Sequence, residues 1–206
     1  MRNSRLLRPF WPMRKALIAI GALVLTAAVV AGIRQAGSTD SATSDGREAL
    51  TRAQVARPLA GAPPELAALR GRVNELTGGG AKALDAQLRA LRGHPVVVNL
   101  WASWCGPCRR ELPFLQRQAV KRGARVAFLG VNSGDNRDDA LELSARFPMP
   151  YPSFEDPRQN VAGRYRALGL PATAFYDARG KLVILHQGEY RSEAKLAGDI
   201  ERYALG

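Results

Sequence analysis

Residues 95–113 read PVVVNLWASWCGPCRRELP, and this stretch predicts a strand, a turn and a helix in succession. Six of its first seven residues are apolar, and three of them are β-branched, which is typical of a buried strand. Cys105 and Cys108 follow that strand, and a helix is expected to run from them to about Arg122. The chain contains two cysteines in all. Both therefore lie where a helix begins behind a buried strand.

This arrangement suits disulfide exchange. A thiolate is the attacking group in that reaction, and an ordinary thiol is mostly protonated at neutral pH. Free backbone N–H groups and the helix dipole stabilise negative charge at a helix N-terminus. Cys105 is therefore the predicted nucleophile, and Cys108, one turn further on, is the predicted resolving cysteine. Pro107 fixes its own φ and stiffens the turn that it forms with Gly106.

Three other interpretations of the pair compete with this one. A structural disulfide between these cysteines would close a very small loop and constrain little unfolded-state entropy. Zinc would need about four ligands, and only His94 and His186 remain, far apart in the sequence. A chance pairing is disfavoured by the strand-to-helix context. We therefore predict no metal and no cofactor beyond a redox-active Cys105–Cys108 disulfide.

The flanking sequence alternates between strand and helix patterns. Helices are expected at residues 64–76, 81–91, 137–147 and 192–203, with 156–168 mostly helical and Ser192 as an N-cap. Strands are expected at 125–131, 172–176 and 181–186, the last two joined by a hairpin turn. This order predicts an α/β fold with a central mixed β-sheet and helices on both faces.

The N-terminal part predicts a membrane segment. Residues 16–33, ALIAIGALVLTAAVVAGI, are 18 residues without charge, long enough to cross a hydrocarbon core as a helix. Five basic residues within 1–15 place that end in the cytoplasm. The length favours an uncleaved signal anchor, because signal-peptide apolar regions usually run about 7–15 residues. A cleaved signal peptide, leaving a secreted or periplasmic protein, is the alternative.

Composition predicts the boundaries of the linker and of the folded domain. Residues 34–62 are small, polar and then rich in proline and alanine, which predicts a flexible linker with a possible short helix at 48–55. A folded domain is expected at 63–206. The formal net charge is +12, but residues 1–34 hold six basic and no acidic residues, so the rest carries +6. No basic run interleaved with aromatics occurs there, which argues against a nucleic-acid partner.

The segment LWASWCGPCRRELP at residues 100–113 resembles the active-site segment of the thioredoxin superfamily. It is most similar to the membrane-anchored, extracytoplasmic TlpA-like branch, related to the thioredoxins of cytochrome c maturation. The resemblance covers about residues 93–205 and implies a thioredoxin-like fold. It matches Pro113 to a proline that kinks the active-site helix. It also implies a cis-proline at Pro171 beside the cysteines, with Leu170 offering backbone hydrogen bonds to substrate.

One position departs from the pattern of cytoplasmic thioredoxins. Asn99 stands where those proteins carry a buried acid, as is common in the TlpA-like branch. The candidate replacement for that acid is Glu111, which matches a glutamate that tunes cysteine acidity in some cytochrome-maturation members. The alternative for Glu111 is a surface residue paired with Arg110 or another nearby arginine. Trp104 is expected to flank Cys105.

The resemblance implies an enzyme, a protein disulfide oxidoreductase. Its expected role is to reduce disulfides of exported proteins, apocytochrome c among them, with electrons from a membrane redox donor. The catalytic domain would lie outside the cell membrane on a single-pass anchor. The alternative is a non-catalytic binding module or a metal chaperone, although a copper carrier would be expected to show CxxxC and a nearby histidine. A peroxidase of the same superfamily would need a different local motif.

Overall fold

The computed structural model describes residues 48–206. The predicted anchor at 16–33, the basic segment before it and the first part of the linker lie outside the described residues. From residue 48 onward, no helix is both long and apolar enough to cross a membrane.

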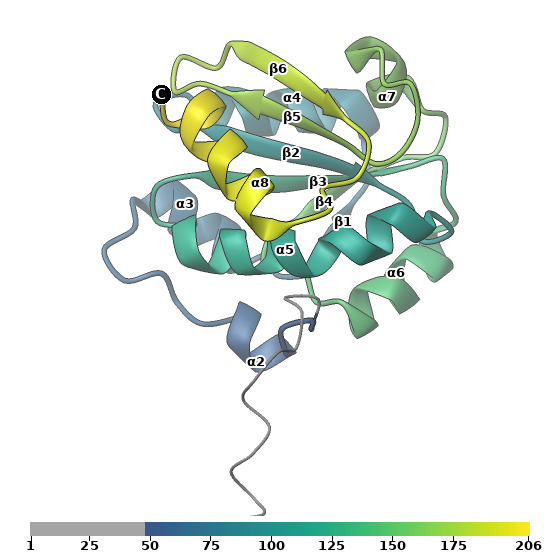
Figure 1. The fold of residues 1–206 in the computed structure, drawn as a ribbon, viewed down its shortest axis with the longest axis horizontal. Coiled ribbons are helices and arrows are strands. Elements are labelled where there is room, and N and C mark those ends of the chain that lie inside the picture. Colours follow the sequence, from purple (N-terminus) through teal and green to yellow (C-terminus); the bar gives the residue numbers. More distant parts are fainter. Residues whose placement is uncertain (1–47) are drawn as a thin grey trace, which may run out of the picture. The chain divides into compact units, whose positions relative to one another are not determined.

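A six-stranded mixed sheet forms the centre of this unit (Figure 1). Four neighbouring strands pair with one another in parallel. The two strands at one edge are joined to them and to each other by antiparallel pairings, as predicted for a mixed sheet. Their order across the sheet is β1 (Leu76–Thr77), β4 (Ser153–Asp156), β3 (Ala127–Ser133), β2 (Val96–Trp101), β5 (Ala172–Tyr176) and β6 (Leu182–Gln187).

Helices cover both faces of the sheet, which confirms the predicted layers (Figure 1). One core lies under α5 (Gly106–Arg122), α6 (Arg137–Arg146), α8 (Glu193–Asp199) and the short π-helix η1 (Ile200–Ala204). The other core lies under α3 (Pro64–Arg70), α4 (Gly80–Ala90) and α7 (Asn160–Tyr165). Successive side chains of a strand point to opposite faces. On β2, Val97 and Trp101 accordingly enter the first core, and Val96, Val98 and Leu100 the second.

Most predicted elements are found within two residues of their expected ends. The strands predicted at 95–101, 125–131, 172–176 and 181–186 are β2, β3, β5 and β6. The helices predicted at 81–91 and 137–147 are α4 and α6, and the helix predicted after the cysteines is α5. Ser192 caps α8 as predicted, because its side chain accepts a hydrogen bond from the Lys195 N–H.

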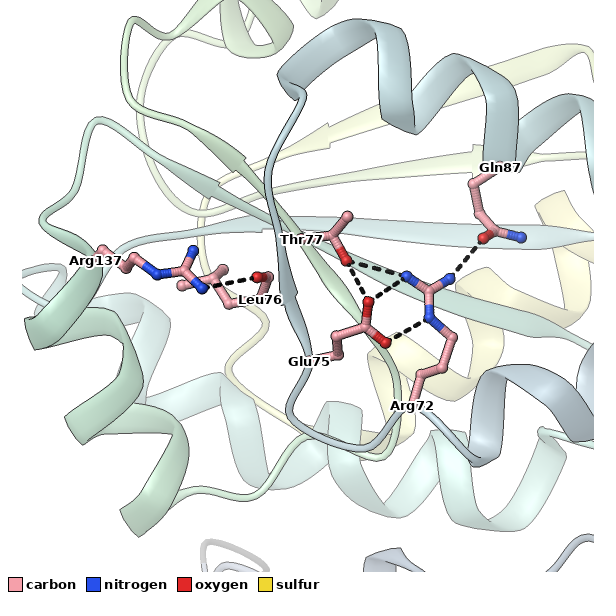
Figure 2. A network of polar contacts seen from close by, with 6 residues as sticks. All are labelled: Arg72, Glu75, Leu76, Thr77, Gln87 and Arg137. Atoms are coloured by element: carbon pink, nitrogen blue, oxygen red, sulfur yellow. Dashed lines mark hydrogen bonds and ion pairs between the residues drawn. The ribbon is translucent and has the colours of Figure 1, made fainter.

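The helix predicted at 64–76 is wrong beyond Arg70, because α3 ends there and Leu76 belongs to β1. Asn74 has φ 60°, a left-handed conformation that no regular helix contains. Arg72 then fixes the chain beyond the helix by hydrogen bonds to Glu75, Thr77 and Gln87 (Figure 2). The chain after Asn74 is therefore extended, and Leu76 and Thr77 pair with β4.

The mostly helical prediction for 156–168 is also wrong in part. Asp156 ends β4, a strand that the sequence did not predict, and α7 covers only Asn160–Tyr165. The Asp156 carboxylate accepts hydrogen bonds from Ser133 Oγ and from the Val161 and Ala162 N–H groups. One buried side chain thus joins the end of β3 to the start of α7.

The second part of the expected flexible linker contacts the domain. Helix α2 (Arg52–Val55) begins at a capping box formed by Thr51 and Gln54, and Val55 is fully buried. Arg70 donates to the Val55 carbonyl at 2.6 Å and to the Ala119 carbonyl of α5 at 2.7 Å. The short helix considered for 48–55 is thus present as α2, residues 50–55 contact the domain, and the folded unit begins before residue 63.

Candidate active site

The two cysteines are joined in a disulfide at the start of α5, with their Cα atoms 5.3 Å apart. Cys105 is the N-cap of that helix, and its Sγ accepts a hydrogen bond from the Cys108 N–H at 3.1 Å. Cys105 is 3% exposed and Cys108 is fully buried. A helix N-terminal N–H aimed at sulfur stabilises negative charge on it. In the reduced protein, this geometry favours a thiolate on Cys105.

The loop between β2 and α5 is held by the end of β3 and the loop that follows. The Asp135 carboxylate accepts from the Ser103 N–H at 2.6 Å and from Ser103 Oγ at 2.7 Å. Trp104, whose side chain is largely exposed, donates from Nε1 to the Gly134 carbonyl at 2.9 Å. This hydrogen bond fixes Trp104 beside the start of α5. Asp135 was not predicted to support the site, and its only sequence signal is its place in the loop after a buried strand.

The loop before β5 meets the site from the antiparallel part of the sheet. The Leu170–Pro171 peptide bond is cis, as the resemblance implied. Ala172, the next residue, pairs with Leu100 near the end of β2. Leu170 packs against the core cluster that contains both cysteines.

Glu111 lies one turn after Cys108 on α5 and is fully buried. Its Oε1 accepts a hydrogen bond from Asn99 Nδ2, and its Oε2 accepts one from the Tyr190 N–H, both at 2.8 Å. Burial raises the pKa of Glu111 to about 8, although both hydrogen bonds oppose that rise. A surface glutamate paired with Arg110 is therefore wrong, and Arg110 pairs with Glu189 instead.

Two buried polar atoms near this carboxyl group have no hydrogen-bond partner within the described chain, Asn99 Oδ1 and Tyr151 Oη. Asn99 Nδ2 also donates to Thr173 Oγ1 at 3.2 Å, so both of its N–H groups have acceptors. Asn99 Oδ1 accepts no hydrogen bond from the described residues. Sequence reasoning identified Asn99 and Glu111 but missed Tyr190. The Tyr190 contribution comes from its backbone, which no side-chain pattern reveals.

The histidines lie in separate surroundings. His94 Nε2 is 3.6 Å from Glu65, whereas the His186 ring stacks on Tyr190 with centroids 4.1 Å apart. Within residues 48–206, no group of three or more His, Cys, Asp or Glu side chains is arranged to hold a metal ion.

The family model described as the AhpC/TSA family matches residues 62–184, more than half of the chain. The chain belongs to this family. The match includes the cysteine pair, Glu111 and the cis-proline loop of this AhpC/TSA-family chain. It supports the predicted membership of the thioredoxin superfamily.

Curated relatives carry names of the predicted kind. A thiol-disulfide oxidoreductase ResA of Geobacillus kaustophilus is 29% identical over 59% of this chain and 68% of the relative. A thiol:disulfide interchange protein DsbE of Pseudomonas fluorescens is 40% identical over 44% of this chain and 49% of the relative. Most of the first matched relatives are thus covered over only about half to two thirds of their length.

Solved structures share the fold. A candidate thiol:disulfide interchange protein DsbE of Chlorobium tepidum is 30% identical, with a TM-score of 0.54 over 58% of this chain and 85% of that one. The exposed lipoprotein thioredoxin Etrx1 of Streptococcus pneumoniae is 25% identical, with a TM-score of 0.50 over 56% of this chain and 89% of that one. The predicted thioredoxin-like α/β fold is confirmed. The prediction of a thiol–disulfide oxidoreductase agrees with the names of these proteins.

Proposed function

We propose that this protein is an extracytoplasmic thiol–disulfide oxidoreductase that reduces disulfides of exported proteins, apocytochrome c among them. The observation that carries this proposal is the Cys105–Cys108 pair at the N-terminus of α5, with the Cys108 N–H donating to Cys105 Sγ. The buried Glu111 one turn away supplies a group that can exchange a proton at neutral pH. The names of the relatives support disulfide exchange as the reaction.

In the first step, the Cys105 thiolate attacks one sulfur of the substrate disulfide. A bond forms between Cys105 Sγ and that sulfur, and the substrate S–S bond breaks. The other substrate sulfur leaves as a thiolate and takes a proton from water. Cys105 is the better placed of the two for this role, because it caps the helix and Cys108 is fully buried.

In the second step, Cys108 resolves the mixed disulfide. Its thiol gives a proton to the Glu111 carboxylate, and the resulting thiolate attacks Cys105 Sγ. Residues three apart on a helix are neighbours on its surface, so Glu111 lies within reach of Cys108 directly or through one water. The substrate leaves with its second sulfur reduced. Two electrons have passed to it, and the protein returns to the disulfide form seen in this structure.

The resemblance to the TlpA-like branch supplies the setting of this reaction. Residues 16–33 anchor the chain in the cell membrane, and the catalytic domain lies on the outer side. A dithiol donor in the membrane reduces the Cys105–Cys108 disulfide again. Trp104, Gly106, Pro107 and the cis-proline loop shape the approach to Cys105, and the Leu170 backbone pairs with an extended substrate segment.

Trapping of mixed disulfides tests the assignment. Cys108→Ser should accumulate covalent adducts on Cys105 in cells, detected by non-reducing electrophoresis and identified by mass spectrometry. Cys105→Ser is the matched control and should give few or none. Equal trapping by both variants would contradict the assigned roles. Absence of adducts from Cys108→Ser, together with no reduction of insulin by the wild-type protein, would overturn the proposed function.

A further inference from the structure

We propose that a groove beside the redox helix, between α5 and α6, binds an acidic segment of the substrate protein next to its disulfide. This inference rests on the proposed function and deepens it, because it names a chemical class of substrate. The position of the groove, its positive charge and its apolar floor all favour such a segment.

The groove begins next to the redox pair. It is a hollow of about 460 Å³ whose lining from α5 starts at Gly106, the residue that follows Cys105, and includes Arg109 and Pro113. From the other side, Leu143 and Arg146 of α6 and the following Phe147 complete it. A polypeptide whose disulfide reaches Cys105 therefore has its neighbouring residues close to this lining.

The groove is positively charged. Arg109 is exposed and makes no ion pair with any residue from 48 to 206, and no carboxylate belongs to the lining. Arg146 pairs with Glu142 at 3.1 Å, but both side chains are more than 60% exposed, so solvent weakens that pair. Guanidinium groups bind carboxylates in a bidentate manner. Two arginines, one of them unpaired, are thus available to acidic side chains of a partner.

The charge continues beyond the groove. Arg110 belongs to the same lining and also to a second hollow of about 290 Å³, which it shares with Phe114, Glu189 and Arg191. Glu189 offsets the charge of Arg110 through their ion pair. Arg191 is exposed and has no ion pair within the described part of the chain. A second acidic position on a longer partner segment would meet this side.

The floor is apolar. Pro113 and Leu143 are buried, and Phe147 is half-buried between them and solvent. An aliphatic or aromatic side chain of the partner can rest there while its acidic neighbours meet the arginines. A freely dissolved anion would use only the charge, so the combination points to a polypeptide.

Three synthetic peptides with one internal disulfide test this inference. They are identical except for four flanking positions, which are all Glu, all Gln or all Lys. With the reduced full-length protein at low ionic strength, the second-order rate constant for single-turnover reduction of the Glu peptide should exceed that for the Lys peptide about tenfold, because opposite charges raise association rates. The difference should shrink in roughly 0.5 M salt as the charges are screened.

In the double variant Arg109→Glu/Arg146→Glu, the preference should reverse, so that the Lys peptide is reduced faster than the Glu peptide. The matched control is Arg89→Glu/Arg179→Glu, which makes the same change in net charge. Arg89 lies on α4, across the sheet from α5, and Arg179 lies in the hairpin turn between β5 and β6; both are exposed. The control should keep the wild-type ratio. Should the reversal variant fail to fold, Arg109→Gln/Arg146→Gln serves in its place and should bring the ratio close to one.

The Gln peptide separates the proposed function from the acidic-substrate inference. If the wild-type protein reduces none of the three peptides, the proposed function fails. If it reduces the Gln peptide but reduces the Glu and Lys peptides at equal rates at low salt, the proposed function stands and the acidic-substrate inference is overturned. That inference is also overturned if the control variant changes the ratio as much as the Arg109 and Arg146 substitutions do.

Discussion

Glu111 accepts hydrogen bonds from two neutral donors. Asn99 Nδ2 and the Tyr190 N–H approach its two oxygens, an arrangement that suits the ionised carboxylate. Burial favours the neutral acid instead and prevails, since the pKa rises to about 8. A neutral Glu111 needs an acceptor for its proton. Asn99 Oδ1, on the side chain that donates to Glu111, is buried and has no hydrogen-bond partner among the described residues.

Glu111→Gln should remove the base for the resolving step. In wild-type protein, the rate at which Cys108 clears a preformed mixed disulfide on Cys105 should rise with pH toward about 8, because the ionised Glu111 accepts the proton. The variant should clear it at least about tenfold more slowly. Single-turnover release of a fluorescent thiol measures this step, with the exposed Glu142→Gln as the control. An unchanged pH profile in Glu111→Gln would contradict the proton role.

The same carboxyl group should make folding stability depend on pH. Its pKa is near 4.5 when unfolded and about 8 when folded, so the unfolded chain releases its proton first. The free energy of unfolding should therefore fall as pH rises from about 4.5 to about 8. Urea unfolding of the oxidised protein at several pH values measures this, because the disulfide-bonded cysteines do not titrate. Glu111→Gln should lack this component; parallel slopes in the two proteins would refute it.

Two arginines near the start of the described chain stabilise different elements. Arg70 is buried and satisfies the carbonyls of Val55 and Ala119, so it joins α2 and α3 to α5. Arg72 is partly exposed and binds Glu75, whose pKa it lowers to about 2 (Figure 2). The first interaction links distant elements, whereas the second only shapes the chain between α3 and β1.

Replacement by alanine should separate these roles. Arg70→Ala should cost about 2–4 kcal/mol, because it leaves the buried Val55 carbonyl without this donor, removes one of two donors to the Ala119 carbonyl and opens space at the junction. Arg72→Ala should cost only about 0.5–1 kcal/mol, as expected for a screened pair near the surface. Urea denaturation gives both values. Hydrogen exchange should also show faster exchange at residues 50–56 in Arg70→Ala alone, and equal behaviour of the two variants would be evidence against the assigned junction.

The elements that the sequence predicted well are those with a strong pattern of their own. β2 and β3 are buried runs dominated by apolar residues, and α5 follows the Cys105–Cys108 motif, which marks the start of a helix. β1 and β4 were missed because they are short and carry polar residues, and pairing with neighbouring strands makes them strands. The cysteines and the buried position of Asn99 could be read from the motif. The contacts of Glu111 could not, because the Tyr190 backbone arrives from 79 residues away.

At the scale of the whole molecule, the linker divides into two parts. Residues 50–55 contact the domain, since the Leu50 N–H donates to Gln116 Oε1, Arg70 donates to the Val55 carbonyl and the Val55 side chain is fully buried. The Arg117 guanidinium also donates to the Glu48 carbonyl. The chain therefore joins the folded unit along α5, the helix that begins at the redox pair. The proposed anchor at 16–33 and the residues up to 47 precede this attachment.

Two truncations should distinguish the tether from the folded unit. Removal of residues 1–47 should release an active domain from the membrane fraction, because the predicted anchor is removed with them. Removal of residues 1–56 should cost about 2–4 kcal/mol more, because it exposes the site of Val55, takes one of two carbonyl acceptors from Arg70 and leaves Gln116 Oε1 without its donor. Membrane fractionation and urea unfolding measure the two effects. Retention of the shorter truncation in the membrane fraction would count against the anchor, and equal stability of the two proteins would count against a docked linker.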